Sequence, residues 1–94
     1  MVKIILADDH KIVRDGLRTL LDKEPNFQVI AEAENGRRAI QLVRELKPDI
    51  VIMDITMPDL NGIEATRQII TESPGVKVVA LSMHSDRRFV AGIL

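Results

Sequence analysis

The 94-residue sequence has no cysteine, no tryptophan and no tyrosine, and it has only two phenylalanines. Without cysteine the chain forms no disulfide bond and no thiolate metal site, which fits a reducing compartment. So few aromatic side chains exclude a stacking platform for single-stranded nucleic acid. No apolar run approaches the length of a membrane span, and the first residues lack the layout of a signal peptide. We therefore expect a cytoplasmic protein.

An excess of either charge is also lacking. The 13 lysines and arginines stand against 14 aspartates and glutamates, which gives a formal net charge of −1. We therefore expect no direct binding to DNA, to RNA or to an anionic membrane. The apolar fraction of 46% is enough for a buried core. The length predicts a single domain that takes in residues 1–94.

Four short apolar segments alternate with segments of helical periodicity. The apolar segments are Val2–Ala7, Phe27–Ala33, residues 49–53 and residues 76–81. Pro25, Pro48 and Pro74 stand where the first three helices should end, and Ser85 is expected to cap a fourth helix that runs to the end of the chain. Strands that alternate with helices predict βαβ units and therefore an α/β fold with a parallel sheet.

Apolar stripes at helical spacing predict which helix faces are buried. They comprise Ile12, Val13, Gly16, Leu17, Leu20 and Leu21 in the first helix, Ala39, Leu42, Val43 and Leu46 in the second, and Ile63, Thr66, Ile69 and Ile70 in the third. We expect all of them to lie in the core. Asn61 with Glu64 three residues later resembles a capping box at the start of the third helix.

The strand at Phe27–Ala33 carries polar residues at alternate positions, so it is predicted to lie at an edge of the sheet. The other three strands are apolar enough to be buried on both faces. With right-handed crossovers this gives the strand order 2-1-3-4, and the chain reverses direction between strands one and three. Ligands of such sheets bind at the carboxyl ends of the strands, beside that reversal.

Polar residues stand at those carboxyl ends. Asp8 and Asp9 follow strand one, Asp54 follows residues 49–53, and Ser82 follows strand four. Clustered carboxylates repel one another, and a hard divalent cation such as Mg²⁺ removes that penalty. A carboxylate can act as a nucleophile and form an aspartyl phosphate, and phosphoryl transfer needs mainly positioning and charge neutralisation. We therefore predict that Asp54, the central carboxylate, is a phosphoacceptor beside a Mg²⁺ site.

The remaining roles follow from the same geometry. Asp9 is expected to bind the metal directly and Asp8 through water or by orientation, with the backbone carbonyl of Thr56 as a further ligand. Taken singly, an aspartate pair after a strand is more often a helix cap or a turn, but the concentration of acids at one rim favours a functional site. His10 and His84 also lie near the rim. Two histidines without a soft ligand are weak evidence for zinc, so we expect turn or capping roles for them.

At these residues the sequence resembles receiver domains of two-component response regulators. The segments that carry the resemblance are Asp8-Asp9-His10, the stretch DIVIMDITMPDLNG at residues 49–62, and Ala80-Leu-Ser82-Met-His84. The resemblance spans the whole chain and is strongest to the subfamily with a C-terminal helix-turn-helix DNA-binding domain (NarL/FixJ/LuxR-like). It implies a flavodoxin-like (CheY-like) doubly wound parallel sheet.

The resemblance also implies roles for individual residues. A histidine kinase would phosphorylate Asp54, Asp9 and Asp54 would bind Mg²⁺ with help from Asp8, and Thr56 would give its carbonyl. Ser82 would be the switch hydroxyl that moves toward the phosphate. Pro58 and Gly62 would shape the loop after Asp54.

Receiver domains continue into a fifth strand and a fifth helix, whereas the 94 residues end inside the expected fourth helix. The resemblance therefore implies an incomplete receiver domain, without the lysine that pairs with the phosphoryl group and without an output domain that binds DNA. We expect weakened phosphorylation for this reason. We also expect the apolar strand at residues 76–81 to become an exposed edge that promotes self-association.

Two other classes of function remain open. One is a phosphate-independent interaction module of the same fold, which Mg²⁺ titration would distinguish because a dead pocket binds no metal. The other is an enzyme, either a phosphatase or a nucleotide-binding protein. An aspartate-based phosphatase usually has a second aspartate two residues after the nucleophile, where this sequence has Thr56, and no glycine-rich phosphate-binding motif is present. We therefore predict a phosphoacceptor switch rather than an enzyme with an external substrate.

Overall fold

The computed structural model describes residues 1–55, 57, 62–81 and 90–91. The elements in chain order are β1 (Val2–Ala7), α1 (Lys11–Asp22), β2 (Phe27–Ala33), α2 (Gly36–Leu46), β3 (Ile50–Asp54), α3 (Gly62–Glu72), β4 (Lys77–Leu81) and β5 (Val90–Ala91). The four predicted strands and the first three predicted helices are all present. No helix among these described residues is long and apolar enough to cross a membrane.

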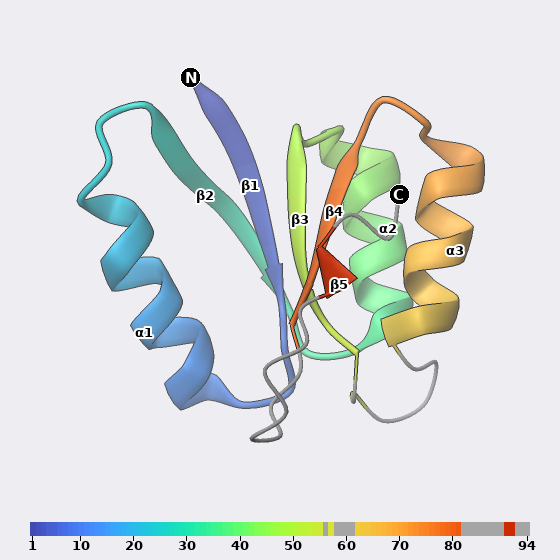
Figure 1. The fold of residues 1–94 in the computed structure, drawn as a ribbon, viewed down its shortest axis with the longest axis horizontal. Helices are drawn as coiled ribbons and strands as arrows, with labels where there is room; N and C mark the ends of the chain where they lie inside the picture. Colours follow the sequence, from blue (N-terminus) through green and yellow to red (C-terminus); the bar gives the residue numbers. More distant parts are fainter. Residues whose placement is uncertain (56, 58–61, 82–89, 92–94) are drawn as a thin grey trace.

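The strands form one sheet in the order β2-β1-β3-β4-β5. The first four are parallel to their neighbours, with β2 at one edge. This confirms the predicted order 2-1-3-4 and the edge position of the second strand. Figure 1 shows α1 on one side of the sheet, next to β1 and β2, and α2 and α3 together on the other side.

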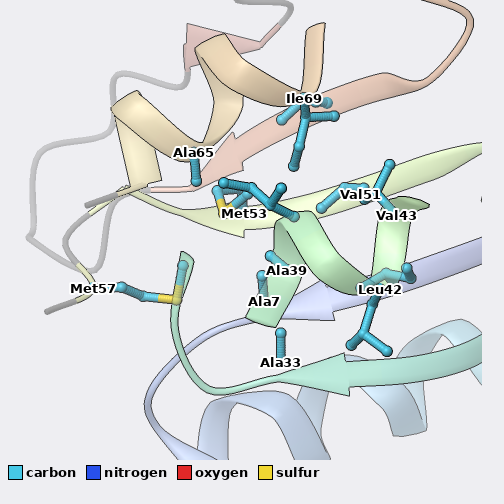
Figure 2. Close-up of a cluster of buried hydrophobic side chains, with 13 residues drawn as sticks. Ala7, Ala33, Ala39, Leu42, Val43, Val51, Met53, Met57, Ala65 and Ile69 are labelled. Carbon is cyan, nitrogen blue, oxygen red and sulfur yellow. The ribbon is translucent and has the colours of Figure 1, made fainter. Parts of the chain in front are cut away.

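The side chains of β1 alternate between the two faces of the sheet, which divides the core into two clusters. Ile5 and Ala7 belong to the larger cluster, where α2 and α3 cover the sheet. Ile4 and Leu6 belong to the smaller cluster, against which Leu17 and Leu21 of α1 pack. Each of the β1 residues from Ile4 to Ala7 is at most 1% exposed. Figure 2 shows the larger cluster. Burying each large apolar side chain contributes about 1.5–3 kcal/mol to the stability of the fold. The two clusters therefore hold the strands, and with them their carboxyl ends, in place.

Local sequence signals fix both ends of α2. Asn35 precedes the helix in an extended conformation, and its side-chain Oδ1 accepts a hydrogen bond of 2.8 Å from the Arg38 N–H. Lys47 ends the helix with a φ of 49°, in the left-handed region, and its N–H donates to the Val43 carbonyl at 2.9 Å. Pro48 disfavours helical geometry at Lys47, so the helix stops there.

The predicted apolar stripes were wrong at their margins. Ile12 is 85% exposed, Leu20 61%, Ile63 47% and Leu46 40%. The periodicity identified the correct general face of each helix, but a helix on a sheet buries only the arc that the neighbouring elements cover. On α1 one buried position is taken instead by Arg14, which is 8% exposed and hydrogen-bonded.

The structure also corrects the expected end of the fold. Val90 and Ala91 form a short strand antiparallel to β4, paired with Ala80 and Val79, and not part of a fourth helix. The edge of β4 is therefore paired at these two positions, which weakens the argument for self-association through an open edge. The predicted capping residues Asn61 and Ser85 lie outside the described residues.

Candidate metal centre

Asp8 and Asp54 lie next to each other at the carboxyl ends of two paired strands. Ala7 of β1 is in register with Met53 of β3, so the following residue of each strand stands at the same edge of the sheet. Asp8 is 2% exposed and Asp54 is 1% exposed. The strand order that was predicted from sequence is what brings together these two carboxylates, 46 positions apart in the chain.

Asp9 and His10 join them from the connection between β1 and α1, and both are exposed. One ligand atom from each of Asp8, Asp9, His10 and Asp54 can be chosen so that all four lie within 4.8 Å of one another. The His10 N–H donates a hydrogen bond of 2.7 Å to Oδ1 of Asp8. The Nδ1 atom of His10 is 3.2 Å from Asp8 Oδ1 and 3.0 Å from Asp9 Oδ1.

The electrostatics of this group favour a cation. Burial raises the pKa of the Asp8 carboxyl, against the lowering effect of the hydrogen bond from the His10 N–H, and the charge of Asp54 raises it further. Oδ2 of Asp8 is buried and accepts no hydrogen bond from the part of the chain that the structure describes. A buried carboxylate oxygen without a donor costs free energy that a bound cation would offset, so the residues present fit a divalent metal ion.

A buried arginine supports the turn that carries Asp8 and Asp9. Nη1 of Arg14 donates a hydrogen bond of 2.6 Å to the Asp8 carbonyl, and its Nε donates to Oε1 of Glu32 at 2.8 Å. Arg18 donates to the other oxygen of Glu32. Burial alone raises the pKa of Glu32, but the hydrogen bonds from the two arginines outweigh it and hold that pKa below its ordinary value. Sequence reasoning missed this network, because nothing local pairs Arg14 with a glutamate 18 positions away.

Two described residues that follow Asp54 in the chain, Met57 and Gly62, pack closely against the rest of the fold. Gly62, the first residue of α3, lies so close to β3 that an added Cβ would stand 2.2 Å from the Asp54 carbonyl oxygen. Met57 is 2% exposed and belongs to the larger core cluster, as Figure 2 shows. The glycine therefore allows α3 to begin directly against the end of β3.

The predicted site residues fall into two groups. Asp8, Asp9 and Asp54 come together, and Gly62 packs beside them. Thr56, Pro58 and Ser82 lie outside the described residues, as does His84. His10 was expected to have only a turn or capping role. It does stand at the position before α1, but its side chain makes no capping hydrogen bond and its ring lies against the carboxylates.

A doubly wound sheet with buried aspartates at the carboxyl ends of β1 and β3 defines a class of α/β domain with an acidic pocket at one edge of the sheet, and comparisons with known proteins identify the family. Residues 4–94 match the response regulator receiver domain. The chain is 44% identical over 93 residues to the transcriptional regulatory protein DegU of Brevibacillus brevis, covering 99% of this chain and 39% of that protein. It is 47% identical over 94 residues to the transcriptional regulatory protein LnrK of Bacillus subtilis (strain 168), covering 100% and 43%.

Solved structures agree. A LuxR-family two-component response regulator from Aurantimonas sp. SI85-9A1 superposes with a TM-score of 0.85 at 44% identity, over 90% of this chain and 61% of that one. The response regulator domain of Thermotoga maritima CheB gives 0.86 at 32% identity, over 96% and 66%. The chain therefore belongs to the response regulator receiver family of two-component signalling, among relatives that are transcriptional regulators. It spans about two fifths of the length of the curated relatives named above.

Proposed function

We propose that Asp54 accepts a phosphoryl group from the phosphohistidine of a histidine kinase. The observation that carries the proposal is the position of Asp54, which is 1% exposed at the end of a central strand and within a few ångströms of Asp8 and Asp9. One carboxylate oxygen of Asp54 forms a bond to phosphorus as the bond from phosphorus to the kinase histidine nitrogen breaks. The histidine takes up a proton and leaves as neutral imidazole.

Asp9 and Asp54 are the proposed direct ligands of Mg²⁺, with Asp8 acting through water or by orientation. The bound ion would neutralise the oxygens of the transferred group, which is the main catalytic requirement of phosphoryl transfer. The buried Oδ2 of Asp8 supports this assignment, since Mg²⁺ takes oxygen ligands and retains water. The carbonyl of Thr56 as a further ligand, Ser82 as the switch hydroxyl and Pro58 as a loop-shaping residue remain proposals.

In the intact protein the receiver would act as a switch and not as an enzyme with an external substrate. Phosphorylation would shift the population of conformations and so control an output domain that binds DNA. The naming of the relatives as transcriptional regulatory proteins supports this part of the proposal. Self-association through β4 also stays a prediction, now restricted to the positions that β5 does not pair.

Intact-mass spectrometry after incubation with acetyl phosphate and Mg²⁺ tests the assignment. The wild type should gain the mass of one phosphoryl group, and Asp54→Asn or added EDTA should abolish the gain. Asp49→Asn is a matched control, because Asp49 precedes the opposite end of β3, is exposed, and its side chain accepts a hydrogen bond from the Lys3 N–H, far from the acidic edge.

Retention of the label in Asp54→Asn would contradict the assignment of the acceptor. If the wild type gains no mass, Mg²⁺ titration of the same sample decides between two explanations. Binding of Mg²⁺ would mean that the metal site is intact but that a group needed for the phosphorylation reaction is missing. Absence of binding would instead favour the phosphate-independent interaction module.

A further inference from the structure

The placement of His10 is not explained by helix capping. The residue before a helix commonly uses its side chain to accept a hydrogen bond from the first helical N–H groups. His10 occupies that position before α1 with extended φ and ψ of −104° and 112°, but its side chain makes no such bond. Its ring nitrogen Nδ1 instead lies 3.0 Å from Asp9 Oδ1 and 3.2 Å from Asp8 Oδ1.

These distances are those of neighbouring ligands on one metal ion. Zinc binds histidine nitrogen and carboxylate oxygen at about 2.0–2.2 Å, so adjacent ligands stand roughly 2.8–3.1 Å apart at an octahedral centre and roughly 3.3–3.6 Å apart at a tetrahedral one. The same distances also suit a hydrogen bond from Nδ1, but a single ring proton serves one acceptor well and here two carboxylates share the nitrogen. A cation would satisfy all three groups together.

A second observation points to a ligand at the same place. The side chain of Asp8 is 3% exposed, and its Oδ2 accepts no hydrogen bond within the described ranges of the chain. It belongs to the group of four residues, with Asp9, His10 and Asp54, whose ligand atoms lie within 4.8 Å of one another. The cluster therefore combines three carboxylates, one of them buried with an unsatisfied oxygen, and one imidazole.

The imidazole changes which metals suit the pocket. Mg²⁺ prefers oxygen ligands and keeps its water, so it gains little from a histidine. Divalent ions of the later first-row transition metals, with Zn²⁺ among them, take imidazole and carboxylate together. A histidine ligand in this pocket would therefore favour transition-metal ions over Mg²⁺.

We propose that His10 is a metal ligand that gives this pocket a selective affinity for transition-metal ions such as Zn²⁺. The inference rests on the acidic pocket of the proposed function, but it concerns a residue and a class of ion outside that function. A Zn²⁺ ion held by Asp8, Asp9, His10 and Asp54 occupies the proposed phosphoacceptor. It therefore competes with Mg²⁺ and with phosphorylation.

Isothermal titration of Zn²⁺ and of Mg²⁺ into the wild type and His10→Asn tests the proposal. Asparagine lacks the imidazole and is a good residue at a helix N-cap, so the start of α1 should not be destabilised in the variant. His84→Asn is the matched control, since it removes the other histidine of the chain. We expect His10→Asn to weaken Zn²⁺ binding by roughly tenfold or more and to change Mg²⁺ binding by less than about twofold. The control should bind both ions as the wild type does.

A second readout is the electron spin echo envelope modulation of bound Cu²⁺, a later first-row ion that takes imidazole ligands. Modulation from a directly coordinated imidazole should be present in the wild type and in His84→Asn, and absent in His10→Asn. Zn²⁺ affinity that is unchanged in His10→Asn, or that falls together with Mg²⁺ affinity, would overturn the proposal. Binding of Zn²⁺ without binding of Mg²⁺ would contradict only the Mg²⁺ role in the proposed function. Binding of neither ion would contradict both that role and the role of His10 as a metal ligand.

Discussion

Arg14 on α1 donates a hydrogen bond of 2.6 Å from its guanidinium to the backbone carbonyl of Asp8. The same guanidinium is bound to Glu32 of β2, so one side chain joins the first helix, the second strand and the acidic turn. A short charged hydrogen bond in a buried setting is stronger than a neutral one and holds its acceptor in place. Arg14 is therefore a positioning residue for the carboxylates, although it touches none of their oxygens in the contacts described.

We expect Arg14→Ala to lower both the Mg²⁺ affinity and the stability of the protein. Loss of hydrogen bonds from a charged group to the buried Asp8 carbonyl and the partly buried Glu32 carboxylate should reduce the free energy of unfolding by about 2 kcal/mol. Mg²⁺ affinity, measured by titration at a temperature where the variant is folded, should fall roughly tenfold, as for other residues that orient metal ligands. Arg18→Ala is the control, because Arg18 also binds Glu32 but is half-exposed and does not reach Asp8. Equal Mg²⁺ affinity in Arg14→Ala and the wild type would refute the positioning role.

Two glycines give opposite predictions for the same substitution. Gly62→Ala places a methyl group 2.2 Å from the Asp54 carbonyl oxygen, so α3 or the end of β3 must move, and we expect a loss of about 1–3 kcal/mol in unfolding free energy. Gly16→Ala meets no atom within 4 Å in α1, so it should gain about 0.5–1 kcal/mol from the better helix propensity of alanine. Urea unfolding of both variants measures the difference. A Gly62→Ala variant as stable as the wild type would show that the close approach to Asp54 is not maintained.

Two isoleucines test which helix residues are buried. Ile69 is 1% exposed in the larger core cluster between α3 and the sheet, so Ile69→Ala should cost about 2–5 kcal/mol of stability. Ile12 is 85% exposed, and Ile12→Ala should change stability by less than about 0.5 kcal/mol. Thermal and chemical denaturation measure both. A large loss for Ile12→Ala would mean that another element covers α1 in solution.

The ion pair between α2 and α3 predicts a pH dependence. Nε and Nη2 of Arg44 donate to the two oxygens of Glu72 at 2.8 and 2.7 Å, and the hydrogen bonds from Arg44, with one from Gln68, lower the pKa of Glu72 from 4.5 to about 2. A carboxyl group whose pKa is lower in the folded state stabilises the fold above its unfolded pKa. That stabilisation is lost as the pH falls from about 4.5 toward 2.

Melting temperatures of the wild type and Glu72→Gln should therefore differ by a small amount at pH 6, with the variant lower, and should converge near pH 2. Because the pair is at the surface, the difference should also shrink at high salt. Asp15→Asn is a suitable comparison, since Asp15 forms an exposed ion pair with Lys11 within a single helix. A difference between wild type and Glu72→Gln that persists unchanged to pH 2 would show that the ionised carboxylate is not its source.

Much of the fold was predictable because its causes are local. The continuous apolar run at Val2–Ala7, the proline after Lys47 and the asparagine before α2 each act within a few residues, so the sequence shows them directly. The meeting of Asp8 with Asp54 was predictable for a different reason. Parallel strands in the order 2-1-3-4 bring their carboxyl ends to one edge, and the order follows from which strands are apolar on both faces.

The sequence by itself therefore determined the strand and helix pattern, the order of the first four strands and the acidic edge of the sheet. The tertiary structure decided which margins of each helix are covered, and it left Ile12, Leu20 and Ile63 exposed. It also decided that Arg14 supports the acidic turn from within α1 and that the His10 ring faces carboxylates and not the helix end. These features depend on where separate elements stand in space. Hydrophobic periodicity shows that a helix face is buried but not how far the neighbouring elements cover it. A hydrogen bond between elements depends on a distance that no local sequence pattern encodes.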